Sequence, residues 1–219
     1  SELMPMGSFK IEMLYGSPDD NMFDSLAFVF LGFLSFFFTF IVAGMALVRE
    51  RFSQTLERVF TTPVRRYQIV GGYMLGYGIL TAVQGLLIIL FAIYVLEVPL
   101  AGSLWLCILV MVLLAFTAVA TGALVSIFAN SEFQVVQFIP IVVIPQVFFT
   151  GLIPLETIPY GLGKLCYLMP VYYGCAPLKE IMIKGAGFSD IYFWLLGLLA
   201  YIALLFLLNV VSLKKYRKL

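Results

Sequence analysis

Five long stretches of the chain are rich in apolar residues and contain no Asp, Glu, Lys or Arg. A helix needs about 20 such residues to cross the roughly 30 Å hydrocarbon core of a bilayer, and each stretch is longer than that. The pattern therefore predicts an all-α bundle of membrane-spanning helices over residues 26–213, flanked by an outer segment (1–25) and a short tail (214–219). The five predicted spans cover about residues 26–48, 69–95, 104–128, 134–153 and 191–213.

A sixth uncharged stretch, residues 165–178, is too short to cross a bilayer and contains Pro170 and Pro177. We expect residues 156–184 to form an extracellular re-entrant hairpin of two short helices instead. Cys166 and Cys175 both fall in this segment. An oxidising face permits a disulfide between them, whereas small buried thiols are the ordinary alternative.

Residues 49–68, RERFSQTLERVFTTPVRRYQ, separate the first two spans. Apolar residues recur there at the spacing of one helix face: Phe52, Leu56, Val59 and Phe60. Thr62 and Pro63 then supply an N-cap and a first-turn proline for the next helix. We predict an amphipathic cytoplasmic helix at about residues 50–61. Its apolar face could lie on lipid headgroups or enter the groove of a partner protein, and both readings stay open on these residues alone.

The distribution of charge predicts the orientation, because cytoplasmic loops carry an excess of Lys and Arg. With five spans, one side of the membrane receives nine of the 13 basic residues but only three of the 12 acids, Glu50, Glu57 and Glu132. We therefore place the N-terminus outside and the C-terminus in the cytoplasm. The nine basic residues are Arg49, Arg51, Arg58, Arg65, Arg66, Lys214, Lys215, Arg217 and Lys218.

The composition excludes several classes of protein. Hydrophobic residues make up 63% and charged residues 11% of the chain, which fits neither a soluble domain nor a disordered one. There is no His, no Gly-rich phosphate loop and no metal-ligand spacing, so we expect no enzyme activity, no cofactor or metal bound by this chain, and no nucleic-acid partner. None of the five spans contains a charged residue, unlike ion-coupled transporters. The energy for any transport would come from a partner.

The fourth span contains two prolines and three glutamines, an unusual set for a membrane helix. Prolines free backbone groups that neighbouring helices must satisfy, and amides can bond across helices. These residues either hold a kinked helix together or line a transport path. Gly72 and Gly76 in the second span form a GxxxG pair, which permits close helix packing. The candidate path residues are Gln84, Gln134, Gln137, Pro140, Pro145 and Gln146.

Three segments together resemble one family. Arg49-Glu50-Arg51, Thr55-Leu56-Glu57-Arg58 and Thr62-Pro63 are similar to the loop after the second helix of ABC transmembrane type-2 permeases, although Gln54 stands where Gly is commoner. Residues 128–159 resemble the family's region from the fourth to the fifth helix, with Gly151, Pro154 and Pro159 in place. Residues 169–185 resemble its second outer helix.

The resemblance implies the permease subunit of an ATP-driven ABC exporter. Its loop would be a coupling helix that docks on a separate ATPase subunit, present in two copies, which would bind the ATP and magnesium. A second permease, identical or a sister chain, would complete the path. The family has six spans with both termini inside, so we expect that a first span and a following outer segment are absent from this sequence. The residues assigned to ATPase coupling are Arg51, Phe52, Thr55, Leu56, Glu57, Arg58, Phe60 and Glu132.

The same resemblance implies a prokaryotic plasma membrane and a path between the first and fourth spans of the two permeases. Uncharged spans and an apolar outer hairpin favour an amphiphilic or drug-like substrate over an ion. Two other functions remain open. The chain could be a channel with an uncharged, glutamine-lined pore, or a membrane scaffold or sensor that transports nothing.

Overall fold

The computed structural model describes residues 22–53, 63–152 and 159–213, and every regular element in these residues is helical. Five segments are long and apolar enough to cross a membrane. The predicted all-α membrane bundle is therefore confirmed. Four of the five segments are single helices: α1 (Met22–Phe52), α3 (Arg66–Tyr94), α4 (Leu104–Ser126) and α9 (Phe188–Ser212).

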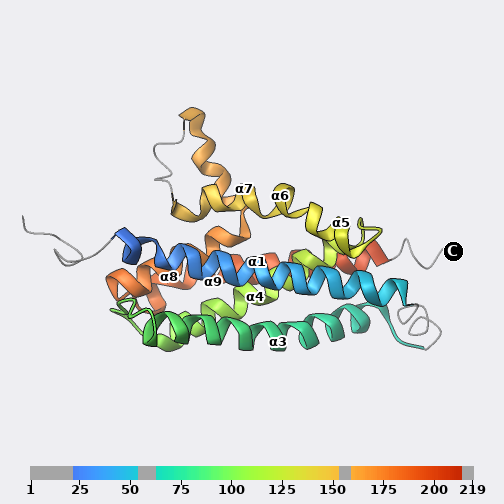
Figure 1. Cartoon of the computed structure of the whole chain (residues 1–219), viewed down its shortest axis with the longest axis horizontal. Helices are drawn as coiled ribbons and strands as arrows, with labels where there is room; N and C mark the ends of the chain where they lie inside the picture. The colour runs from blue at the N-terminus through green and yellow to red at the C-terminus, as the bar shows by residue number, and fades with distance from the viewer. Residues whose placement is uncertain (1–21, 54–62, 153–158, 214–219) are drawn as a thin grey trace, which may run out of the picture.

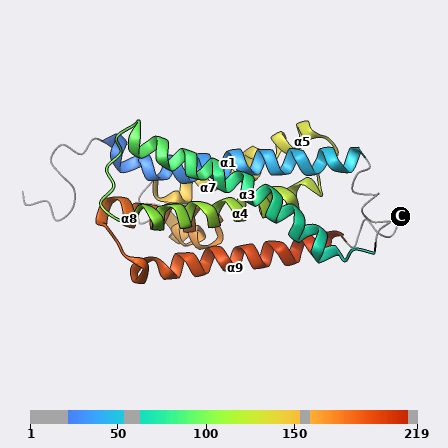
Figure 2. The ribbon, with the colours of Figure 1, turned by 90° about the horizontal axis from the view of Figure 1, so that it is seen from below.

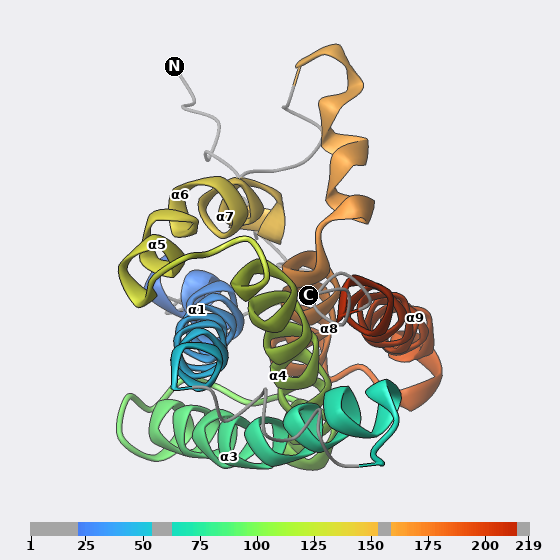
Figure 3. The same ribbon diagram turned by 90° about the vertical axis from the view of Figure 1, so that its right-hand side faces the viewer.

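Helix α4 lies at the centre of the bundle. It packs against α1, α3, α9 and the shorter α8 (Pro170–Lys184). Figure 3, which looks along the bundle from one end, shows α4 with α1 on one side, α3 below it, and α8 and α9 on the other side. Because α4 has neighbours on all sides, its second half is buried and built largely of small residues: Ala115, Ala118, Ala120, Gly122 and Ala123.

Two glycines determine how closely α1 and α4 cross. A Cβ atom on Gly122 would lie 2.7 Å from the carbonyl oxygen of Phe40, and one on Gly44 would lie 3.5 Å from the carbonyl oxygen of Gly122. Small residues of this kind allow helix backbones to approach each other in a membrane. The GxxxG pair of α3 does not serve this purpose, because no atom of the described residues lies within 4 Å of the corresponding positions at Gly72 and Gly76.

The fourth span is broken into short pieces. It consists of α5 (Glu132–Gln137), α6 (Ile139–Val142), α7 (Ile144–Val147) and a π-helical segment, η1 (Phe148–Leu152). The breaks fall at Phe138 and Val143, each two residues before a proline. Proline has no N–H for the preceding turn and its ring displaces the carbonyl four residues earlier, so each proline interrupts the helix. Figure 1 shows these pieces running along one side of α1.

The predicted outer hairpin has one α-helical limb. Its first limb, η3 (Pro159–Leu168), is a 3₁₀ helix that projects from the bundle, and its second limb is α8 (Figure 1). Gly185, with a φ of 69°, ends α8 in the left-handed conformation that glycine adopts without strain. Cys166 and Cys175 are both buried and free, so no disulfide joins them in this structure.

Four arginines gather at one end of the bundle, where α1, α4 and α9 end and α3 and α5 begin. We call it the arginine end, after Arg49, Arg51, Arg65 and Arg66; it lies at the right in Figure 1. With 31 residues, α1 is about 46 Å long, so its last turn reaches beyond a hydrocarbon core of about 30 Å. Glu50, Arg51 and Phe52 continue α1, four residues past the predicted end of the first span, and most of the predicted helix at about residues 50–61 lies outside the described residues.

Candidate functional site

The last turn of α1 presents three consecutive charged residues, Arg49, Glu50 and Arg51. Successive residues of an α-helix point about 100° apart, so the three side chains face different neighbours. The role of each side chain therefore follows from its own contacts.

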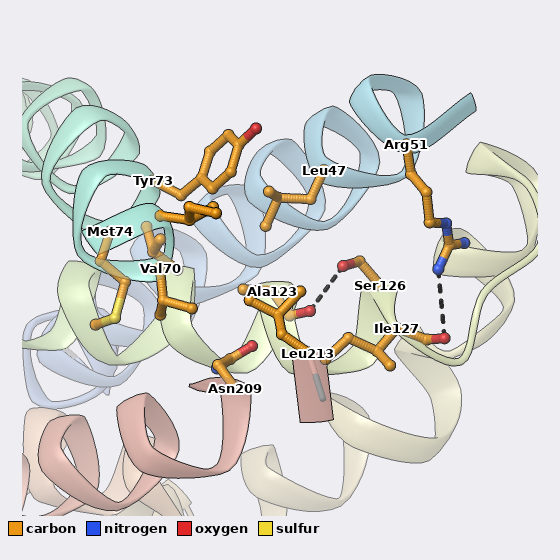
Figure 4. Close-up of a pocket in the computed structure, with 12 residues that line it drawn as sticks. Leu47, Arg51, Val70, Tyr73, Met74, Ala123, Ser126, Ile127, Asn209 and Leu213 are labelled. Carbon is orange, nitrogen blue, oxygen red and sulfur yellow. Dashed lines mark hydrogen bonds between the residues drawn. The ribbon is translucent and has the colours of Figure 1, made fainter. Parts of the chain in front are cut away.

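Arg51 points inward, toward the end of α4. Its guanidinium donates to the carbonyl oxygen of Ile127 at 3.4 Å, and to that of Ala129. Figure 4 shows this side chain reaching from α1 to the segment that follows α4. The last carbonyls of a helix have no intrahelical partner and carry partial negative charge, so a cation is favourable there. Arg51, predicted to contact the ATPase, thus joins α1 to the end of α4.

Glu50 joins the same turn of α1 to a different helix. Its Oε1 atom accepts a hydrogen bond of 2.8 Å from the hydroxyl of Tyr77 in α3. The ring of Tyr77 stacks on that of Tyr73, one turn earlier, with the two planes 9° apart. Together, Glu50 and Arg51 hold the end of α1 against both α3 and α4.

A cleft of about 490 Å³ opens beside the end of α1. Its walls come from two segments almost eighty residues apart in the chain. We call this surface the α1–α5 face, and define it by Arg49, Phe52, Ser53, Asn130, Ser131 and Glu132. The side chain of Phe52 is 60% exposed, and Phe128 and Phe133, next to the turn, are 64% and 70% exposed. The face therefore combines exposed aromatic rings with charges of both signs.

The turn between α4 and α5 is held by its own side chains. The hydroxyl of Ser131 accepts a hydrogen bond from the backbone N–H of Gln134, and the amide oxygen of Gln134 accepts one of 2.6 Å from the N–H of Asn130. Below them, Val135 is buried in a small cluster with Val48 of α1. Glu132, in the first turn of α5, is thus presented from an ordered turn, next to the end of α1.

Of the predicted coupling residues, the structure brings together Arg51, Phe52 and Glu132, and only the last two line the cleft. The remaining five lie outside the described residues: Thr55, Leu56, Glu57, Arg58 and Phe60.

The six predicted path residues do not converge on one surface. Gln84 lies on α3 and lines an apolar groove of about 690 Å³ between α1 and α3, across the bundle from the fourth span (Figure 3). Gln134 is used in the turn described above. Gln146 is buried, donating to the carbonyl oxygen of Val142 at 2.7 Å and accepting from the N–H of Val171 in α8 at 3.3 Å. The exposed ones are Gln137 and Pro140, while Pro145 is half-buried.

The described residues contain no group of three or more His, Cys, Asp or Glu that could hold a metal ion. In the described part of the chain, the buried polar side chains are hydroxyls and amides, and Asn209 of α9, like Gln146, bonds to a second element. Its Nδ2 atom donates to the carbonyl oxygens of Ala120 at 3.0 Å and of Leu205 at 2.8 Å. The buried hydroxyls of Thr81, Thr117 and Thr121 instead donate within their own helices.

Comparison with known proteins identifies the family. A family model described as "ABC-2 family transporter protein" matches residues 3–211, almost the whole chain. The chain belongs to the ABC-2 transporter family. The resemblance seen in its sequence motifs is therefore confirmed, and this ABC-2 chain is a multi-pass membrane protein of the ABC permease type.

Curated relatives agree with this assignment. ABC transporter G family member 20 of Dictyostelium discoideum is 28% identical over 208 residues, which cover 94% of this chain and 28% of that protein. The inner membrane transport permease YhhJ of Escherichia coli is 28% identical over 81% of this chain and 47% of its own length. The probable multidrug ABC transporter permease YbhR of Escherichia coli is 26% identical over 69% and 42%. The ABC-2 chain spans less than half the length of each of these relatives.

Sequence reasoning gave no role to Glu50 or Asn209, which the structure places at helix contacts. A signal for both was present. Glu50 is the first acid after an uncharged span, and Asn209 is the one amide in the span of residues 191–213. Polar side chains near or inside a membrane usually face a protein partner, so each could have been assigned to an interface.

Proposed function

We propose that this ABC-2 chain is the membrane-spanning permease subunit of an ATP-driven exporter, and that its α1–α5 face docks on the ATPase subunit. The observation that carries the proposal is the position of Phe52 and Glu132, which come from distant segments and line one cleft beyond the end of the first span. Exposed aromatic and arginine side chains are typical anchors of protein interfaces. A face of this kind suits a soluble partner better than it suits lipid.

The proposed orientation places the arginine end in the cytoplasm of a prokaryotic cell, with the first described residues of α1 toward the outside. The described part of the arginine end contains Arg49, Arg51, Arg65 and Arg66 against the acids Glu50 and Glu132. Such an excess of arginine is characteristic of cytoplasmic loops. ATP, the substrate of the ATPase, is on the same side of the membrane.

In this proposal the chain itself binds no cofactor. Two copies of the ATPase would hold ATP and magnesium, and a second permease, identical or a sister chain, would complete the transporter. Residues 55–60 follow the α1–α5 face directly in the chain, so Thr55, Leu56, Glu57, Arg58 and Phe60 would extend the same contact. Arg51 would transmit it to α4, to which it is hydrogen-bonded.

We place the transport path along the exposed side of the fourth span, where it would face the second permease. Gln137 and Pro140 are exposed there, in a helix that prolines have already broken. Broken helices in membranes are tolerated where they line a cavity or are covered by protein. Spans without charge support an amphiphilic or drug-like substrate, and the relative YbhR, a probable multidrug ABC transporter permease, points the same way.

The test is co-purification of the full-length protein with its ATPase, followed by nucleotide-dependent transport in proteoliposomes. Phe52→Asp and Glu132→Lys should each lower recovery of the ATPase and abolish transport, because both alter the α1–α5 face. Lys164→Glu, an equal change of charge in the exposed part of η3, is the matched control and should leave recovery unchanged. Full ATPase recovery with both face variants would refute the docking site. Ion conductance without nucleotide would favour the channel instead.

A further inference from the structure

A second pocket at the arginine end lies inside the bundle, between α1, α3, α4 and α9. Figure 4 shows its lining, with Val70 and Met74 of α3 facing Ala123 of α4 and Leu213 after α9. In Figure 2, α3 crosses the bundle obliquely, and its first turns approach the end of α9. The pocket has a volume of about 60 Å³.

The lining of this pocket is suited to an apolar group. Two of its polar side chains are already bonded to the protein, since Asn209 donates to Ala120 and Leu205, and the hydroxyl of Ser126 donates to the carbonyl oxygen of Ala123 at 2.6 Å. A water molecule needs two to four polar partners in a cavity, and apolar cavities instead take up hydrocarbon. The volume corresponds to about four to six water-sized groups, comparable to the end of an alkyl chain.

Two arginines stand near this pocket: Arg51 lines it, and Arg66 does not line it but lies one turn from its lining on α3. Arg66 precedes Ile69 and Val70, two lining residues, by one helical turn, so it lies on the same face of α3 and nearer the end of the bundle. Arg51 borders the pocket from α1. The first turn of α3 contains no acid, so the positive end of the helix dipole adds to the charge of Arg66. Guanidinium groups bind phosphate in a bidentate manner.

We propose that this pocket and Arg66 form a binding site for one anionic phospholipid, with an acyl chain between α3 and α9 and the phosphate at Arg66. The membrane leaflet that borders the arginine end supplies such a molecule directly. A helix of a partner protein is about 10 Å across and does not fit a pocket of this volume. The site lies within one chain. It does not depend on the identity of a transported substrate, or on whether the chain transports anything.

Binding at this position would hold four helices together at one point. A ligand that binds only the folded state raises the apparent stability in proportion to the logarithm of its concentration. The lipid should therefore raise the melting temperature of the protein, in addition to occupying the pocket.

The experiment uses the full-length protein in phosphatidylcholine nanodiscs. Phosphatidylglycerol with a photoreactive diazirine near the end of one acyl chain is the probe, and its phosphatidylcholine analogue is the reference. We expect mass spectrometry to find cross-links on peptides that contain Val70, Met74 or Leu213, with the anionic probe preferred. Arg66→Gln should lower that preference about tenfold, the effect of losing one charge-assisted contact. Ala123→Leu should fill the pocket and remove the cross-links.

Two matched controls separate this site from general contact with lipid. Arg49→Gln removes an equal charge from the same end, and Leu75→Trp enlarges a side chain on the exposed face of α3; both should retain the specific cross-links. Equal labelling by the two probes, or cross-links confined to the face of Leu75, would overturn the proposal. If Ala123→Leu does not fold, Arg66→Gln decides alone, because an unchanged preference in that folded variant contradicts the site.

Discussion

Replacing Arg51 by Ala removes the hydrogen bonds that join the end of α1 to the segment after α4. Hydrogen bonds that involve a charged group contribute about 1.5–3 kcal/mol each, and a cation at a helix C-terminus adds about 0.3–1 kcal/mol. Arg51 is only half-buried and its bond to Ile127 is long at 3.4 Å, so solvent replaces part of both contributions. We expect a loss of about 2 kcal/mol in total.

The loss should be local to the turn between α4 and α5. A free-energy change of about 2 kcal/mol corresponds to a roughly 30-fold change in the opening equilibrium. Hydrogen exchange, measured by mass spectrometry on the detergent-solubilised protein, should therefore show a 10- to 50-fold loss of protection in amides of residues 128–136, with little change in the centre of α4. Arg51→Lys should restore part of the protection, because one ammonium group cannot span two carbonyls as the guanidinium fork does.

Arg49→Ala is the control for this prediction. Arg49 lies two residues away on the same helix turn, faces the cleft and is exposed, so its removal should leave the exchange of the turn within about threefold. The reasoning is refuted if Arg51→Ala leaves the protection of residues 128–136 unchanged. It is equally refuted if the two variants have the same effect. The loss of protection would then come from removing a positive charge from this end of α1, and not from the hydrogen bonds of Arg51.

Three further changes test other contacts. Gly122→Ala places a Cβ against the backbone of α1 and should cost about 1–3 kcal/mol, seen as a lower unfolding midpoint, whereas Gly76→Ala, with open space around it, should be neutral or stabilising. Gln146→Leu leaves the N–H of Val171 without its acceptor and should cost about 1 kcal/mol, while Gln146→Glu should retain part of that bond. Burial raises the pKa of the Cys166 thiol, so maleimide should label it slowly at neutral pH and faster as the pH rises; rapid labelling at pH 7 would contradict its buried position.

The number of spans could be predicted because it depends on the length of uncharged segments, which is a one-dimensional property. The bilayer imposes a minimum length on any crossing helix, and residues 165–178 fall short of it. The fragmentation of the fourth span was only partly foreseeable. Pro140 and Pro145 predict two irregularities in the helix. A proline in a membrane helix can produce a kink or a full break, depending on which neighbours bond the backbone groups that it leaves without a partner.

The partners of individual side chains could not be predicted in the same way. Arg51 was assigned to an external partner, yet the structure turns it toward α4, because its direction depends on where α1 ends. The glycines show the same limit. Gly72 and Gly76 have the recognisable spacing but face open space, while Gly44 and Gly122 come from different helices and form the close crossing. A contact between two distant segments produces no periodic pattern in the sequence of either segment, so periodicity does not predict it.

Treated as a rigid rod that turns about its close crossing with α4, α1 has two arms of unequal length. Its fulcrum is Gly44, and the helix continues for eight residues to Phe52 on one side and for twelve residues to Gly32 on the other. At 1.5 Å per residue the arms are about 12 and 18 Å long, so a push of about 1 Å at Phe52 would swing Gly32 by about 1.5 Å in the opposite direction. There the helix meets Cys175, whose sulfur leaves too little room even for a methyl group at Gly32. A force applied at the α1–α5 face would thus be delivered, amplified, to α8 on the far side of the fulcrum.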